Sequence, residues 1–173
     1  MKKYLILFLM FFGLTTANAQ TSSLGYFNFR FGIDKIAKNV TFVENNAGLQ
    51  FGYFFTDNWG LEADLQLSFK YNEMSSNRVG ANVIWQNTKF HEDMTPFIKI
   101  GVAYKGFEFD KDIEEDICHG LDAKMGVGIN VPVSDWISLN FGVNYHHFFA
   151  GKGWGMVSKD NIETELGICL LLY

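Results

Sequence analysis

The chain alternates apolar and polar residues over most of its length. The clearest run extends from Leu61 to Tyr71, where every second residue is apolar and each residue between them is polar or charged. A period of two is typical of a β-strand, because successive side chains point to opposite faces. The same alternation recurs along the chain and predicts eight strands, at about 24–33, 46–55, 59–71, 78–88, 96–107, 120–131, 136–148 and 161–173.

The composition fits long strands. Proline occurs twice in the 173 residues, whereas glycine occurs 17 times and aromatic residues make up 17% of the chain. Aromatic residues favour strands, and glycine leaves space on a crowded face. We therefore expect an all-β fold in a single domain.

Short and long links between the predicted strands alternate. The long links are polar or glycine-rich and comprise 34–45, 108–119 and 149–160, whereas the short ones comprise 56–58 and 132–135. An outer-membrane barrel has tight turns at one end and larger loops at the other. Two links fit this scheme less well, because 72–77 is short for an outer loop and 89–95 is long for an inner turn.

Three features place the apolar face of the strands against lipid. Aromatic residues with polar tips lie near the strand ends, with Trp59, Trp85 and Trp136 beside the expected inner turns and Tyr71, Tyr104 and Tyr145 near the outer ends. Such belts are typical of membrane interfaces. The strands are long enough to cross a bilayer, and glycines on the polar face suit a narrow lumen. A secreted soluble barrel of the lipocalin type, with the faces reversed, is the alternative.

Residues 1–19 have the order of a secretory signal peptide. Two lysines precede an apolar run from Tyr4 to Leu14, which is too short to span a bilayer, and Ala17-Asn18-Ala19 follows. Cleavage there would leave 154 residues, 20–173, and would change the formal charge from -5 to -7 by removing the two lysines. An acidic, exported chain argues against a nucleic-acid partner.

The last predicted strand ends the chain on an aromatic residue, Tyr173. With this ending, the eight alternating segments and the N-terminal signal, residues 20–173 resemble the small outer-membrane β-barrel family, the OmpA-like and OmpX-like barrels also described as porin-family proteins. The resemblance implies an eight-stranded antiparallel up-and-down transmembrane β-barrel in the cell envelope of a Gram-negative bacterium. The cleaner apolar face of the last strand runs on alternate residues from Ile162 to Leu172, so the orientation of Tyr173 stays open.

The polar faces of the strands carry charges of both signs, which a membrane barrel would enclose. We expect a lumen network of six basic and five acidic residues: Arg30, Glu62, Asp64, Lys70, Arg78, Lys99, Lys105, Asp122, Lys124, Glu163 and Glu165. Charges confined in a narrow lumen must pair, because an isolated buried charge is very unfavourable. We expect Glu62 and Asp64 to form ion pairs with Arg30, Arg78 or Lys99.

The two cysteines and the acidic loop suggest no further site. Cys118 falls in the link 108–119 and Cys169 lies near the opposite end of the last strand, too far apart for a disulfide. His119 lies beside Cys118 and the acidic residues Glu114, Glu115 and Asp116, but their spacing matches no calcium or zinc motif. We therefore predict neither a metal site nor a cofactor.

The pair His146-His147 is the one local feature that suggests catalysis. Lipid A deacylases of the outer membrane use a histidine, a serine and a glutamate on the outer wall, with the serine two residues after the histidine. Phe148 and Phe149 stand at the corresponding positions here, so no nucleophile is supplied. A palmitoyltransferase-like set of histidine, aspartate and serine is not evident either. We predict no catalytic residues and no enzymatic activity.

The function expected from the sequence is structural or surface-exposed, with the outer loops as the contact surface. The loop residues proposed as contacts are Phe42, Val43, Phe107, Phe109 and Trp154. The expected partners are outer-membrane lipid and lipopolysaccharide, a surface or host ligand is a candidate partner of the loops, and the chain is expected to be a monomer. A narrow channel for ions or small solutes is the alternative, followed by a lipid A-modifying enzyme.

Overall fold

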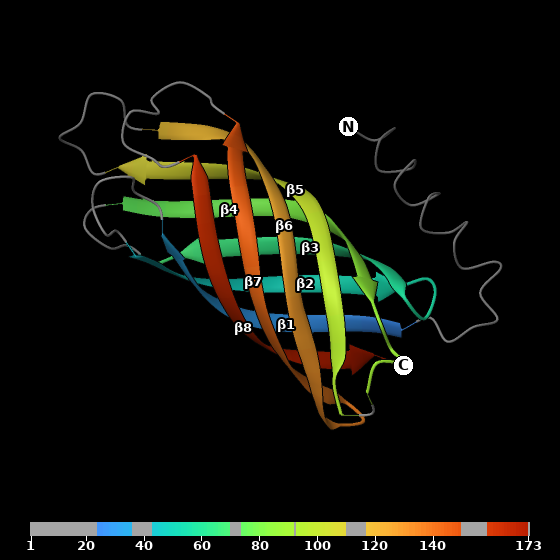
Figure 1. Ribbon diagram of the computed structural model, residues 1–173. Helices are drawn as coiled ribbons and strands as arrows, with labels where there is room; N and C mark the ends of the chain where they lie inside the picture. Colours follow the sequence, from blue (N-terminus) through green and yellow to red (C-terminus); the bar gives the residue numbers. More distant parts are fainter. Residues whose placement is uncertain are drawn as a thin grey trace, which may run out of the picture.

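The computed structural model describes residues 24–35, 43–69, 74–91, 93–109, 117–149 and 159–172. Eight strands follow chain order around a closed barrel, each antiparallel to its neighbours, and the first strand pairs with the last (Figure 1). The strands are β1 (Leu24–Lys35), β2 (Val43–Phe54), β3 (Trp59–Ser68), β4 (Met74–Gln86), β5 (Thr95–Phe109), β6 (Ile117–Ser134), β7 (Ile137–Phe149) and β8 (Asp160–Leu172). The predicted all-β, eight-stranded antiparallel barrel is confirmed. Among the described residues, no helix is long and apolar enough to cross a membrane.

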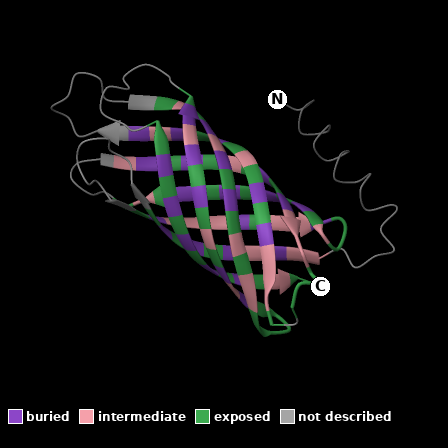
Figure 2. Cartoon of the chain, viewed as in Figure 1, coloured by how far each residue is buried: buried purple, intermediate pink, exposed green. Residues whose placement is uncertain are grey.

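The barrel is apolar on its outer face and polar on its inner face, the reverse of a soluble barrel. Buried and exposed residues alternate along the strands, most regularly in β3 and β8 (Figure 2). Most of the large apolar residues point outward and the buried charged residues point inward: Leu67 is 68% exposed, whereas Arg30 is 1% exposed. The orientation of a lipocalin-type soluble barrel is therefore excluded.

The strand boundaries differ from the prediction, chiefly at the ends. Strand β4 begins at Met74 rather than at 78, and β6 extends from Ile117 to Ser134, so the expected turn at 132–135 lies largely within the strand. The expected loops 34–45, 108–119 and 149–160 are correspondingly shorter. In the added residues, such as Asp34-Lys35 of β1 and Ser75-Ser76-Asn77 of β4, the regular alternation of apolar and polar residues is lost although the ladder of hydrogen bonds continues.

The barrel has two distinguishable ends. We call the turn end the one with the links 55–58, 87–94 and 135–136, where β1 begins and β8 ends, and the opposite one the loop end. Trp59 pairs across the ladder with Trp85 at the turn end, and Trp136 lies in the link between β6 and β7. Tyr104 and Tyr145 are exposed on the outer wall toward the loop end. Tyr71 and Tyr173 lie outside the described residues.

Candidate functional site in the barrel interior

The charged residues predicted for the lumen occupy its interior. Ten of the eleven lie in the described part of the chain and every one of them is buried, whereas Lys70 lies outside the described residues. They comprise the cations Arg30, Arg78, Lys99, Lys105 and Lys124 and the carboxylates Glu62, Asp64, Asp122, Glu163 and Glu165. The equal numbers of each sign allow mutual compensation, which buried charges require.

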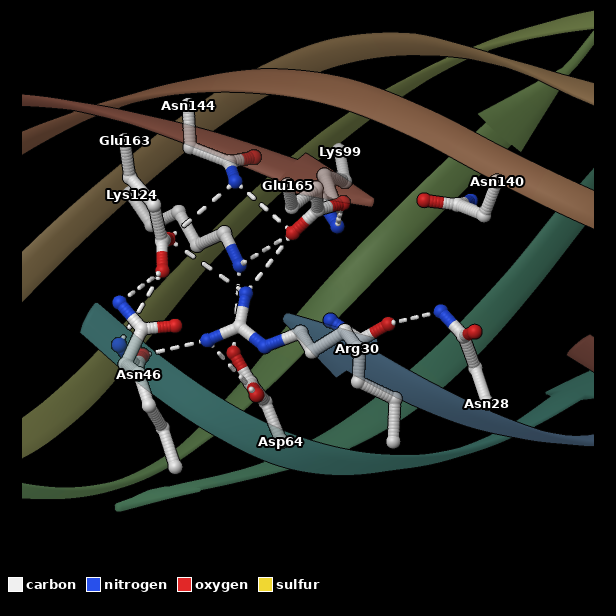
Figure 3. A network of polar contacts seen from close by, with 12 residues as sticks. Asn28, Arg30, Asn46, Asp64, Lys99, Lys124, Asn140, Asn144, Glu163 and Glu165 are labelled. Atoms are coloured by element: carbon white, nitrogen blue, oxygen red, sulfur yellow. Dashed lines mark hydrogen bonds and ion pairs between the residues drawn. The ribbon is translucent and has the colours of Figure 1, made fainter. Parts of the chain in front are cut away.

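Arg30 on β1 joins strands on both sides of the lumen (Figure 3). Its guanidinium lies 2.8 Å from Glu165, 3.4 Å from Glu163 and 3.5 Å from Asp64, and it donates a further hydrogen bond to Gln66. A planar guanidinium with five N–H groups can serve several acceptors at once. Arg30 thereby connects β3 with β8 across the interior.

Arg78 and His146 form a second centre of the network, toward the loop end. Arg78 lies 3.2 Å from Asp64, 3.4 Å from Glu163 and 3.6 Å from Asp122. His146 Nδ1 lies 2.8 Å from Asp122 and its Nε2 lies 3.0 Å from Glu163, while Arg78 Nη1 is 3.0 Å from Nδ1. His146 was not among the predicted lumen residues, although it is in phase with the inward-facing residues of β7.

Lys99 and Lys124 complete the compensation of the carboxylates. Lys99 forms an ion pair with Glu165, and Lys124 lies 3.2 Å from Asp64 and 3.9 Å from Glu165. Asn144 adds Nδ2 hydrogen bonds to Glu165 at 2.9 Å and to Glu163 at 3.3 Å. Asp64 and Glu165 therefore each contact two or more cations.

The ion pairing expected for Glu62 is wrong in the described part of the chain, whereas that expected for Asp64 occurs. Glu62 accepts hydrogen bonds from Tyr26 Oη and Asn82 Nδ2, both at 2.7 Å, and no ion pair of Glu62 is found among the described residues. The reason is its level in the barrel. Glu62 lies one inward position closer to the turn end than Asp64, where a phenol and an amide reach it before any cation does.

An aromatic cluster lies at the loop side of the network, and it corrects another expectation. Phe107 was proposed as an exposed loop contact but is 0% exposed, with its ring 5.8 Å from that of Phe148. Lys105 Nζ lies 4.8 Å from the centroid of the Phe107 ring. Phe107 is the last residue of the strand predicted at 96–107, and it shares the inward phase of Lys99 and Lys105, so its ring also points inward. Of the other proposed contacts, Phe42 and Trp154 lie outside the described residues, as do the side chains of Val43 and Phe109.

The turn end of the interior is hollow. A cavity of about 220 Å³ is lined by Leu24, Tyr26, Asn28, Phe54, Glu62, Ile84, Gln86, Thr88, Thr95, Phe97, Lys99, Asn130, Pro132, Ser138, Asn140, Cys169 and Leu171. Three of its aromatic rings lie against glycines of the neighbouring strand, Tyr26 on Gly52, Phe54 on Gly60 and Phe97 on Gly128. Because a glycine has no side chain, each ring packs directly against the wall at its glycine, and the centre of this half stays open.

Comparisons with known proteins agree with this architecture. A family model described as the outer membrane protein beta-barrel domain matches residues 4–168. The chain belongs to this family. No curated protein sequence matches this outer-membrane barrel significantly.

Solved structures of other barrels superimpose on this outer-membrane barrel at low sequence identity. Neisserial surface protein A has a TM-score of 0.68 at 12% identity, covering 87% of this chain and 97% of its own. The N-terminal β-barrel domain of Pseudomonas aeruginosa OprF has a TM-score of 0.65 at 12% identity, covering 87% and 100%. The attachment invasion locus protein Ail of Yersinia pestis has a TM-score of 0.61 at 10% identity, covering 88% and 100%. At such identities the likeness shows the fold alone.

His147, the second residue of the pair His146-His147, lies on the outer wall of the barrel. His147 Nδ1 lies 2.7 Å from Asp160 Oδ1, and the Tyr145 hydroxyl donates to the same oxygen at 2.5 Å. Phe149, two residues after His147, lies beside the imidazole with ring centroids 4.9 Å apart. A histidine and a carboxylate are thus brought together, but the position of the deacylase serine holds a phenylalanine that cannot act as a nucleophile.

The cysteines and the acidic segment add no site to the described part of the barrel. Cys169 is a free, buried thiol in the turn-end cavity, and Cys118 belongs to the first residues of β6 rather than to a loop. The two positions lie at opposite ends of the barrel. Among the described residues, no group of three or more histidine, cysteine or acidic side chains could hold a metal ion. Glu114, Glu115 and Asp116 lie outside the described residues.

Proposed function

We propose that this chain spans the bacterial outer membrane as a monomeric, non-enzymatic barrel with a structural or surface-contact role. Its family and its outward apolar belt support the location. Large apolar residues such as Phe31, Ile100 and Leu121 are each more than half exposed on the outer wall, where water would make them unfavourable and acyl chains would not. The tryptophans at the turn end fit one membrane interface.

The observation that carries the structural role is the ion-pair network across the lumen. Arg30 on β1 and Arg78 on β4 both reach Glu163 on β8, and Arg30 also reaches Asp64 on β3. Eight strands enclose an interior that side chains can fill. A solute passing through would have to break several buried, hydrogen-bonded ion pairs together, and breaking one such pair typically costs about 3–5 kcal/mol.

Planar-bilayer conductance tests this role against the channel alternative. The purified chain should insert without giving a stable open current. The variant Glu165→Gln, which removes one charge that Arg30 and Lys99 contact, should increase brief openings, whereas Thr164→Gln, on the outward face of the same strand, should not. A reproducible open current of the unmodified chain that lumen substitutions abolish would establish a channel instead.

The membrane assignment and the absence of catalysis have separate tests. A membrane barrel should fold into detergent micelles or lipid vesicles and migrate differently in electrophoresis before and after heating. A chain that stays folded and monomeric in water without either would contradict the assignment. Mass spectrometry of lipid A from expressing cells should show no change, and the loss of an acyl chain would establish an enzyme.

Contacts through the outer loops follow from the same proposal. Lipopolysaccharide is the partner expected at the loop end, and a surface or host ligand would be contacted by the loop residues beyond the strands. Replacing residues 110–116 with a short glycine-serine link should leave the barrel folded, because the ladder between β5 and β6 ends before them. Binding of cells to immobilised host matrix, compared before and after this replacement, measures the contribution of the loop.

A further inference from the structure

The turn-end cavity has the properties of a binding site rather than of a packing defect. Its rim is formed by the strand ends around Leu24, Thr95 and Leu171, and its inner part reaches Asn28, Lys99 and Asn140, beside the ion-pair network. We propose that this cavity binds a small uncharged polyol about the size of one sugar ring. The site is independent of the outer loops and of the structural role proposed above.

Two buried amide oxygens point to a ligand that carries hydrogen-bond donors. The oxygens Asn28 Oδ1 and Asn140 Oδ1 are buried and have no hydrogen-bond partner among the described residues, and both residues line the cavity. Their Nδ2 groups are already used, Asn28 donating to Gln50 and Asn140 to Asn130, each at 2.7 Å. Both residues lie at the edge of the network in Figure 3. Four further buried oxygens without a hydrogen-bond partner in the described part of the chain lie in the ion-pair network, on Asn46, Asp64, Asp122 and Asn144. The oxygens of Asn28 and Asn140 differ from these because both residues line the cavity, where a ligand can supply a donor.

Gly167 on β8 lies beside both residues, and the amide of Asn28 packs directly against it. It pairs with Asn140 across the ladder from β7, and an added Cβ at this position would lie 2.5 Å from Asn28 Oδ1. Asn28 on β1 and Asn140 on β7 therefore flank the same bare stretch of β8.

The charges of the wall exclude a charged ligand. Glu62 and Lys99 are the charged residues among those lining the cavity. Glu62 already accepts from Tyr26 and Asn82, and Lys99 is paired with Glu165. A net charge on the ligand would have to compete with these partners in a desolvated site, and an uncharged ligand would not.

Size and lining favour a polyol over other uncharged molecules. Sites for drug-sized ligands have volumes of about 300–1,000 Å³, and this one, at about 220 Å³, fits little more than one ring. The flat rings of Tyr26, Phe54 and Phe97 offer apolar surfaces to the C–H face of a sugar. Neutral hydroxyl and amide groups are spread around the wall, at Gln86, Thr88, Thr95, Asn130 and Ser138, and a phenol or an aliphatic alcohol would leave most of them unused.

Cys169 is a native reporter for the test, because its thiol lines the cavity. The full chain carrying Cys118→Ser, folded in detergent, has this thiol alone. A small methanethiosulfonate reagent should modify it, and glucose at millimolar to tens of millimolar concentrations should slow the modification several-fold. Trehalose, too large for the cavity, serves as the osmotic control and should not slow it.

A matched pair of variants distinguishes binding at the cavity from a general sugar effect. Asn140→Leu removes one unpartnered acceptor and should raise the half-protecting glucose concentration about tenfold, the equivalent of one hydrogen bond. Asn77→Leu, an exposed outward position on β4, should leave it unchanged. Heat-modifiable migration verifies that each variant folds, and Asn140→Asp, which keeps an acceptor, provides a second variant.

Three results would overturn the proposal. Cys169 could resist even the small reagent, which would mean that the cavity cannot be reached. Glucose could give no more protection than trehalose, which would mean that the cavity holds only water. Glucose could also protect Asn140→Leu and the parent equally, which would mean that the amide oxygens do not take part.

Discussion

The two halves of the barrel interior solve the same packing problem in opposite ways. Toward the loop end, long charged side chains fill the lumen and connect strands across it, as Arg30 and Arg78 do. Toward the turn end, the rings of Tyr26 and Phe97 pack against glycines of adjacent strands and leave a cavity. The same barrel thus encloses a network of paired charges in one half and the turn-end cavity in the other. The difference shows that the inward side chains, rather than the number of strands, decide whether an eight-stranded lumen is filled.

The charged half should be the more sensitive to the loss of a single side chain. Arg30→Met would leave the buried carboxylates Asp64, Glu163 and Glu165 with one cation fewer. We expect the free energy of unfolding to fall by about 3–5 kcal/mol, the usual cost of breaking a buried ion pair. Urea unfolding in lipid vesicles, followed by heat-modifiable migration, measures it.

Arg30→Lys is the control for this variant. It keeps the charge but loses the planar set of donors that reaches several acceptors, so its stability should lie between those of Arg30→Met and the parent. A loss below about 1 kcal/mol for Arg30→Met would mean that the network contributes little beyond filling space.

The alternation of polarity made the barrel and the members of the network predictable, but not the partners within the network. The phase of a residue shows whether it faces inward, and the phase of β7 could have identified His146. Which inward groups meet depends on the register between strands distant in sequence, such as Arg30 opposite Gly167. Glu62 was therefore expected beside a cation although it meets Tyr26. Phe107 was expected to be exposed because its apolar side chain and its place at the end of the predicted strand suggested a loop contact, although its phase matches that of Lys99 and Lys105.

The hollow half should be sensitive to added volume rather than to lost charge. An added Cβ at Gly60 would lie 2.8 Å from Cδ1 of Phe54 and 2.9 Å from the carbonyl oxygen of Tyr53. Gly60→Ala should therefore destabilise the barrel by about 2 kcal/mol, because the ring and the backbone must both move. The same unfolding measurement quantifies this loss.

Gly25→Ala is the matched control at the same end of the barrel. Its nearest neighbour would be Cβ of Leu172 at 3.5 Å, an ordinary contact, so stability should stay within about 0.5 kcal/mol of the parent. Equal effects of the two alanines would show that the Phe54 ring does not depend on the bare surface of Gly60.

The finest comparison replaces the same residue type in both halves of one strand. Asn144 donates to Glu163 and Glu165, whereas Asn140 donates to Asn130 in the cavity wall, and the amide oxygens of both have no partner among the described residues. Because hydrogen bonds to charged groups are the stronger, Asn144→Leu should cost more unfolding free energy than Asn140→Leu, by about 1 kcal/mol. Adding glucose should narrow this difference if Asn140 contributes to binding, since glucose would stabilise the Asn144→Leu barrel more than the Asn140→Leu barrel. If the two variants lost the same free energy of unfolding without sugar, the amide in the network would contribute no more than the amide in the cavity wall. The division of the interior into two halves would then have no energetic basis.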